Sequence, residues 1–391
     1  MNLEPKICYQ ALLTHDRRFD GVFFIGVRST HIYCRPVCTV KIPLEKNCTF
    51  HASAAAAEQA GFRPCLRCRP ELAPGSAIID SSGRLAAVIS RSIEDGALSE
   101  NTVAELAEQL GISERHLRRI VDAEFGVSPI DLAQTQRLLL AKRLLTDTNL
   151  PITDIAFASG FASVRRFNVL FKERYKLNPT QLRKTGVNKA STDMLRFELG
   201  YRPPLDWDSL VKFLAMRTAG GAETFQNDKL LRTVQIGDSK GWLEAAPHPD
   251  KPVIVVHISN NLSRVLLPLL TKLRRLFDLD ADPHAISQHL GTLSVARPGL
   301  RVPGAFDGFE LGARAILGQQ VSVKGASTLM TRFVEAFGSP IETPHEELTH
   351  ISPTAKQVAK LTPETIAEKV KIPLVRARAI NELGAAPLLR R

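Results

Sequence analysis

The sequence predicts a multidomain α+β protein. Two close pairs of cysteines lie within the first seventy residues, and such pairs are typical of a small metal-stabilised domain. The stretch that follows shows helical periodicity and contains the same helical unit twice. The second half of the chain mixes strand-like segments with helical ones. A chain of 391 residues has room for two to four domains, so each of these regions can form a domain of its own.

The cysteines of the first region are spaced as metal ligands. Cys34 and Cys38 form the first pair, and Cys65 and Cys68 form the second. Each pair can turn two thiolates toward one point, and four thiolates suit a tetrahedral Zn²⁺ site with zinc–sulfur bonds of about 2.3 Å. A cluster of this kind carries net negative charge, so one of its sulfurs can act as a nucleophile. A purely structural zinc site has the same spacing and is the alternative.

Basic residues lie around these cysteines in the sequence, and the whole chain has a net charge of +11. Cations beside a nucleophilic sulfur would bring the phosphates of DNA up to it. We therefore predict phosphate contacts from Arg35, Lys41, Arg63 and Arg67. A basic surface that is merely solvated would have the same composition, so charge alone does not decide between these interpretations.

Two segments around the cysteines, residues 23–38 and 60–70, resemble the N-terminal domain of the Ada DNA-repair regulators. The resemblance implies an Ada-like zinc domain over residues 1–78. In that family the four cysteines bind zinc, and the first of them accepts a methyl group from a methylphosphotriester in DNA. The matching residue is Cys34, so the resemblance implies a suicidal methyltransferase that is consumed in its own reaction. Loss of one thiolate charge would then strengthen binding to DNA.

The region from residue 80 to 186 is predicted to be all-helical, with two helix-turn-helix units. In the first unit, Thr102 and Glu105 form a capping box, and Gly111 supplies the turn before the next helix. The same layout recurs around Gly160, which indicates an internal duplication. Each unit ends in a helix whose polar face suits the major groove of DNA. The residues predicted to face DNA are Arg115, His116, Arg118, Arg119, Arg165, Arg166, Asn168 and Lys172.

The second unit, from Ala156 to Tyr175 and on to Pro179, resembles the AraC-type DNA-binding domain. That resemblance implies sequence-specific binding to promoter DNA, activation of transcription and contact with RNA polymerase. The arginines suit phosphate contacts as well as base contacts, so no base is assigned to any of them.

Residues 193–300 are predicted to form an α/β platform without a reactive cluster of side chains. The segment from Tyr201 to Trp207, together with that from Leu276 to Leu279, resembles the N-terminal domain of the AlkA-type 3-methyladenine DNA glycosylases. The expected strands are 194–199, 232–236, 242–246 and 253–257, and the expected helices are 207–217 and 262–277.

Residues 301–391 resemble the first part of the helical domain of the same glycosylases, chiefly through residues 309–323. The resemblance implies that Gln319 lies at a remnant of the active-site cleft and that Gln320 fills the gap left by a flipped base. A helix-hairpin-helix motif and the catalytic aspartate beyond it, both needed for the family's chemistry, have no match in the sequence. We therefore expect an incomplete helix-hairpin-helix domain, truncated at its C-terminal side, without base excision.

The sequence thus predicts a DNA alkylation-damage response protein with Zn²⁺ as its cofactor and double-stranded DNA, alkylated or promoter, as its partner. A working 3-methyladenine glycosylase and a plain zinc-containing AraC-type regulator are the alternatives. No apolar run reaches the roughly eighteen residues of a membrane helix, and the N-terminus lacks the layout of a signal peptide. We therefore expect a cytoplasmic protein with no membrane partner.

Overall fold

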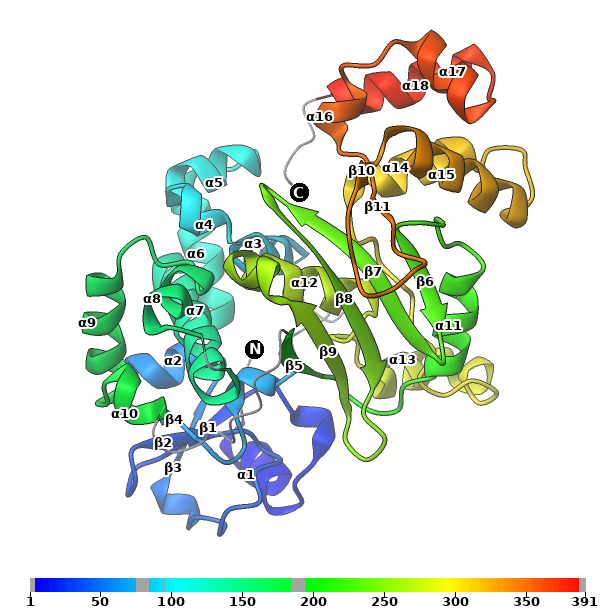
Figure 1. The fold of residues 1–391 in the computed structure, drawn as a ribbon. Coiled ribbons are helices and arrows are strands. Elements are labelled where there is room, and N and C mark those ends of the chain that lie inside the picture. The colour runs from blue at the N-terminus through cyan, green and yellow to red at the C-terminus, as the bar shows by residue number, and fades with distance from the viewer. Residues whose placement is uncertain (1–3, 75–83, 95, 149, 184–193, 387–391) are drawn as a thin grey trace.

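The computed structural model describes residues 4–74, 84–94, 96–148, 150–183 and 194–386. A small sheet domain and a helical domain lie side by side, a larger sheet adjoins both, and the C-terminal helices lie beyond that sheet (Figure 1). The predicted α+β class is confirmed. The predicted domain boundaries at 78–80 and 186–193 fall outside the described residues. Within those ranges, no helix combines the length and the apolar character that a membrane span would need.

The N-terminal domain is a four-stranded sheet in the order β3-β1-β2-β4, flanked by short helices. Its elements are α1 (Pro5–Leu13), β1 (Phe24–Val27), β2 (Ile32–Cys34), β3 (Cys48–His51), α2 (Ala54–Gln59) and β4 (Arg63–Pro64). The pairing of β2 with β4 is parallel, with Tyr33 opposite Pro64. Because Cys34 follows Tyr33 and Cys65 follows Pro64, this pairing brings the two cysteine pairs together.

The helical domain confirms the two predicted helix-turn-helix units. Thr102 and Glu105 form the capping box, and the side chains of Ser113 and Ser163 cap the two recognition helices, α6 and α9. Gly160 adopts a positive φ of 82° in the second turn, where a side chain would be strained. The helices are α3 (Arg84–Glu94), α4 (Ala97–Glu100), α5 (Val103–Gln109), α6 (Glu114–Phe125), α7 (Pro129–Asp147), α8 (Ile152–Ala158), α9 (Val164–Tyr175) and α10 (Pro179–Arg183).

The platform is a five-stranded antiparallel sheet in the order β5-β9-β8-β7-β6. Its strands are β5 (Met194–Gly200), β6 (Glu223–Gln226), β7 (Lys229–Ile236), β8 (Ser239–Pro247) and β9 (Val253–Ser259). Its helices are α11 (Trp207–Ala215), α12 (Leu266–Leu276) and α13 (Pro283–Leu290). The four predicted strands and both predicted helices are present, whereas β6 was not expected because its residues, Glu-Thr-Phe-Gln, lack a clear apolar pattern.

The C-terminal helices form a separate hydrophobic cluster that includes Phe309, Phe333 and Ile366. The elements of this region are α14 (Gly308–Leu317), α15 (Val323–Phe337), β10 (Ser339–Pro340), β11 (His350–Ile351), α16 (Ala355–Val358), α17 (Pro363–Val370) and α18 (Leu374–Ala385). The β10–β11 pair contacts the platform, where Thr233 Oγ1 donates a hydrogen bond to the His350 carbonyl at 2.7 Å.

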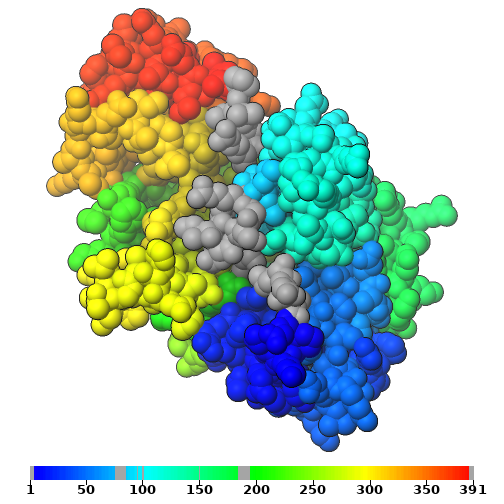
Figure 2. Space-filling view, turned by 180° about the vertical axis from the view of Figure 1, so that it is seen from behind, coloured from blue at the N-terminus to red at the C-terminus, as the bar shows by residue number. Residues whose placement is uncertain are grey.

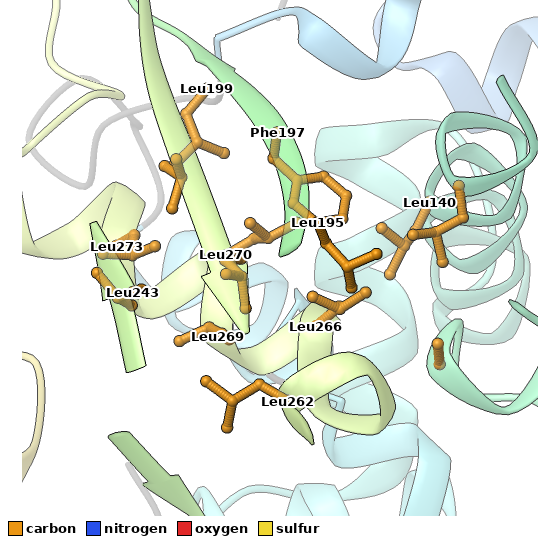
Figure 3. Close-up of a cluster of buried hydrophobic side chains, with 14 of the residues drawn as sticks. Leu140, Leu195, Phe197, Leu199, Leu243, Leu262, Leu266, Leu269, Leu270 and Leu273 are labelled. Atoms are coloured by element: carbon orange, nitrogen blue, oxygen red, sulfur yellow. The ribbon is translucent and has the colours of Figure 1, made fainter. Parts of the chain in front are cut away.

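One continuous hydrophobic core joins the second helix-turn-helix unit to the platform. Leu140 of α7 lies close to Leu195 and Phe197 of β5 and to Leu266 of α12 (Figure 3). At the same boundary the guanidinium of Arg143 stacks 4.7 Å from the centre of the Phe197 ring. The helical domain and the platform therefore share one interior. Seen from behind, the blue N-terminal domain also touches the yellow part of the platform (Figure 2).

Candidate metal centre and nucleic-acid interface

Four sulfurs converge at one end of the N-terminal sheet. The Sγ atoms of Cys34, Cys38, Cys65 and Cys68 all lie within 4.8 Å of one another, and none of these cysteines forms a disulfide. Zinc–sulfur bonds of about 2.3 Å in a tetrahedron separate the sulfurs by about 3.8 Å, which agrees with this spacing. The donor set, four thiols and no carboxylate, is the one that zinc prefers for a closed site. The cluster therefore fits Zn²⁺, as the sequence predicts.

The four sulfurs differ in their hydrogen bonds to the backbone. The N–H of Arg35 donates to Cys68 Sγ at 3.4 Å, and the N–H of Arg67 donates to Cys65 Sγ at 3.4 Å. The hydrogen bond with Cys34 and, more weakly, one from the backbone of Val40 lower the pKa of the Cys38 thiol. In the described part of the chain no backbone N–H is hydrogen-bonded to Cys34 Sγ. Cys34 is thus set apart from its three neighbours.

Arg35 occupies a different position from the one expected of a phosphate contact. Its side chain is only 14% exposed, forms an ion pair with Asp20 and donates a hydrogen bond to the carbonyl of Cys68 at 3.1 Å. The buried guanidinium therefore stabilises the backbone of the second cysteine pair. Lys41 and Arg67 are exposed and Arg63 is half-buried, so their predicted phosphate contacts stay predictions.

A buried ion network, which the sequence did not reveal, links the metal domain to α7. Lys142 is 1% exposed and its Nζ lies 2.6 Å from a carboxylate oxygen of Glu71. Arg69, with a left-handed φ of 53°, contacts Glu71 at 3.1 Å and Asp147 at 2.6 Å. The one available signal was the pair Lys142-Arg143 inside the apolar run of α7, because a buried cation needs a buried anion.

Glu58 of α2 is a second buried group that the sequence did not reveal. It accepts hydrogen bonds from the hydroxyl of Tyr33 at 3.0 Å and from that of Thr135 at 3.1 Å. Burial raises the pKa of Glu58 to about 7, against the lowering effect of these hydrogen bonds. Since Tyr33 precedes Cys34 and Thr135 belongs to α7, this carboxyl joins the metal domain to the helical domain.

The predicted DNA-facing residues all lie on the outer surface of α6 and α9, although His116 is only half-exposed. The two helices differ in how these side chains are engaged. In α6, Arg118 forms an ion pair with Glu114 at 2.5 Å, and Arg119 contacts His116 Nδ1 at 3.0 Å. In α9, no ion pair or side-chain hydrogen bond to another described residue is found for the remaining predicted contacts: Arg165, Arg166, Asn168 and Lys172.

A cavity of about 470 Å³ lies between the platform and the C-terminal helices. It is lined by Phe213 and Leu311 and by an ion network in which Glu310 contacts Arg232 and Arg314. Gln319 and Gln320, the two predicted cleft residues, are exposed in the turn between α14 and α15, whose neighbouring residues line the cavity. The structure thus places both glutamines at the cavity's edge but not in its wall.

Three parts of the chain match known domain families. Residues 7–71 match the metal binding domain of Ada, residues 106–185 match a helix-turn-helix domain, and residues 196–307 match the AlkA N-terminal domain. The resemblances to Ada, to helix-turn-helix regulators and to AlkA that the sequence predicts are confirmed.

Known proteins match either nearly all of this chain or about half of it. The chain is 37% identical over 390 residues to the probable bifunctional transcriptional activator/DNA repair enzyme AlkA of Mycobacterium tuberculosis, covering 97% of this chain and 77% of the relative. It is 35% identical over 192 residues to DNA-3-methyladenine glycosylase 2 of Escherichia coli, covering 49% of this chain and 67% of that protein. It is 31% identical over 177 residues to AdaA of Bacillus subtilis, covering 45% of this chain and 81% of that protein. The chain therefore belongs to the family of bifunctional transcriptional activator/DNA repair enzymes, with an Ada-type zinc domain, a helix-turn-helix domain and an AlkA-type region.

Proposed function

We propose that Cys34 accepts a methyl group from a methylphosphotriester in DNA, and that the methylated protein activates transcription. The observation that carries the proposal is the absence, among the described residues, of a backbone N–H hydrogen bond to Cys34 Sγ, whereas Cys65 and Cys68 each accept one. A hydrogen bond to a thiolate stabilises its charge and makes it a weaker nucleophile. By this criterion Cys34 is a stronger nucleophile than Cys65 and Cys68, and the resemblance to Ada selects it over Cys38.

The reaction is a displacement at the methyl carbon. The Cys34 thiolate attacks that carbon, the carbon–oxygen bond breaks with its electron pair going to the phosphate oxygen, and the products are a thioether and an ordinary phosphodiester anion. A methylphosphotriester is uncharged, so it does not repel the thiolate as a diester would. Bound Zn²⁺ would hold the four cysteines as thiolates at neutral pH. The exposed Lys41 and Arg67 suit the flanking phosphates.

Methylation removes one negative charge from the cluster and so reduces its repulsion of DNA. A unit charge about 7 Å from a phosphate, at an effective dielectric of about 40, is worth roughly 1 kcal/mol, and several phosphates contribute. The repaired protein would bind DNA about tenfold more tightly or better. The helix-turn-helix units would then hold it at promoter DNA, where it contacts RNA polymerase.

Mass spectrometry after incubation with methylphosphotriester DNA tests the proposal. The peptide that contains Cys34 should gain one methyl group, and DNA without the lesion should leave it unmodified. Cys48→Ser is the matched control, because Cys48 is a free, half-buried cysteine outside the cluster and its loss should leave methyl transfer intact. A methyl group found on Cys38, Cys65 or Cys68 instead would contradict the role of Cys34. DNA binding without any methyl transfer would favour the plain zinc-containing regulator.

The cavity between the platform and the C-terminal helices supports a second candidate function, excision of alkylated bases. Its volume of about 470 Å³ is large enough for a flipped purine, and Gln319 and Gln320 stand at its edge. Abasic sites formed in alkylated DNA by the purified protein would establish this second function.

A further inference from the structure

The outer face of α9 carries a single large apolar side chain among polar ones. Val169 is 61% exposed, whereas Phe167, Phe171 and Tyr175 form the buried face of the same helix. At about 100° per residue, Val169 points almost directly away from the buried face. The helix lies at the outer edge of the helical domain, away from the platform (Figure 1), so this face is open.

Cations surround Val169 on this surface. Arg165 and Arg166 precede it by one helical turn and Lys172 follows it by three residues, so all three are its neighbours on the helix. Each is exposed, and none forms an ion pair with another described residue. The surface is therefore a positive rim with an apolar centre.

The first recognition helix has a different centre. Counting from the capping serines, Ser113 and Ser163, the position of Val169 in α9 is that of Arg119 in α6. Arg119 is a long hydrogen-bond donor, and its guanidinium contacts His116. The duplication thus preserves the helix and its cap but replaces a donor by a short apolar side chain at the point that reaches furthest outward.

We propose that Val169 reads the C5 methyl group of a thymine in the major groove. The inference rests on the proposed reading of DNA by α9. The positive rim suits the phosphates on either side of the groove, and these contacts position the helix without selecting a sequence. The thymine methyl is the apolar group that the major groove presents, and apolar side chains recognise it by contact. A valine at the centre of the face matches that group in polarity and size.

The experiment uses the full-length protein and a binding site selected from random duplex DNA. Each thymine of the selected site is then replaced by deoxyuridine, which lacks the C5 methyl group and pairs identically. At one position the replacement should weaken binding by wild type about fourfold, the equivalent of one buried methyl-sized group. Val169→Ala should bind the original site about fourfold more weakly and should no longer respond to the deoxyuridine at that position.

Two control variants distinguish a failure of the inference about Val169 from a failure of DNA reading as a whole. Val375→Ala removes another exposed valine, 78% exposed on α18, and should keep the full response to deoxyuridine. Arg119→Ala should weaken binding and also keep that response, because it acts on the other half of the site. Equal deoxyuridine responses of wild type and Val169→Ala at every thymine would overturn the inference alone. Failure of the wild-type protein to select any site would overturn the proposed reading of promoter DNA, and the inference with it.

Discussion

The two helix-turn-helix units share a layout but pack in different surroundings. The recognition helix of the first unit buries Leu117 and Val121 in a cluster of aliphatic side chains that includes Ala55 of the metal domain. At the same positions the second unit has Phe167 and Phe171, which belong to the core shared with the platform. The duplication thus kept the local signals, serine caps and glycine turns, while the buried face changed to fit each unit's neighbour.

The largest expected effect comes from truncating the buried face of each recognition helix. Phe167→Ala should cost about 3–5 kcal/mol and Leu117→Ala about 2–5 kcal/mol of unfolding free energy. Because Phe167 lies in the shared core, its loss should lower amide protection in β5 and β9 of the platform as well. Leu117→Ala should leave those strands protected. Hydrogen exchange measured by mass spectrometry checks both, and a platform unaffected by Phe167→Ala would show that the two parts fold independently.

A smaller effect concerns the boundary between the metal domain and the helical domain, where Glu58 is buried. The carboxyl of Glu58 faces Thr135 of α7, Tyr175 of α9 and the positive Arg174. Its pKa is raised to about 7 in the folded protein from 4.5, so only the folded state holds the proton between these values. Glu58 should therefore contribute a fall of about 3 kcal/mol in unfolding free energy as the pH rises through this window.

Denaturant unfolding at a series of pH values measures this slope. Glu58→Gln removes one ionisable proton and should make the fall between about pH 4.5 and 7 shallower without abolishing it, because burial also raises the pKa of Glu94 to about 7. Glu173→Gln, an exposed carboxyl of α9, serves as the matched control and should leave the slope in place. A slope in Glu58→Gln equal to that of the wild-type protein would mean that Glu58 does not contribute to the pH dependence.

The smallest expected effect concerns how the first helix of each unit begins. Helix α5 starts at a capping box between Thr102 and Glu105, whereas α8 starts at Pro151 without a side-chain cap. Thr102→Ala should therefore cost about 1 kcal/mol. Thr153→Ala, an exposed change in the first turn of α8, should stay within about 0.5 kcal/mol. Urea unfolding midpoints measure the loss of stability in both variants. Equal losses would show that the capping box does not distinguish the two units.

Features set by neighbouring residues were predictable from the sequence. The spacing of Cys34 and Cys38 identifies a metal site because a short loop already holds two ligands together. The serine caps and the glycine turns identify the two units for the same reason. In the platform, strand β6 was not predicted. Its sequence is largely polar, and it forms a strand because it pairs with β7.

Features made by distant residues were not predictable. Lys142 and Glu71 are 71 residues apart, and Thr135 and Glu58 are 77 apart, so no local pattern relates them. Arg35 shows the converse. Its position beside Cys34 suggests a phosphate contact, but folding brings Asp20 to it from another part of the sheet domain. The sequence shows where a cation lies along the chain, but only the fold shows whether an anion of the same chain already pairs with it.

The leucines that α7 and β5 contribute to one interior have a consequence for how such a protein can be divided. Sequence families draw a border between the helix-turn-helix region and the AlkA-type region, yet Leu140 and Leu199 lie on opposite sides of it and pack in the same cluster. A fragment that ends at that border would expose its part of the hydrophobic core to water and would tend to self-associate. The family border therefore does not coincide with a boundary of the hydrophobic core.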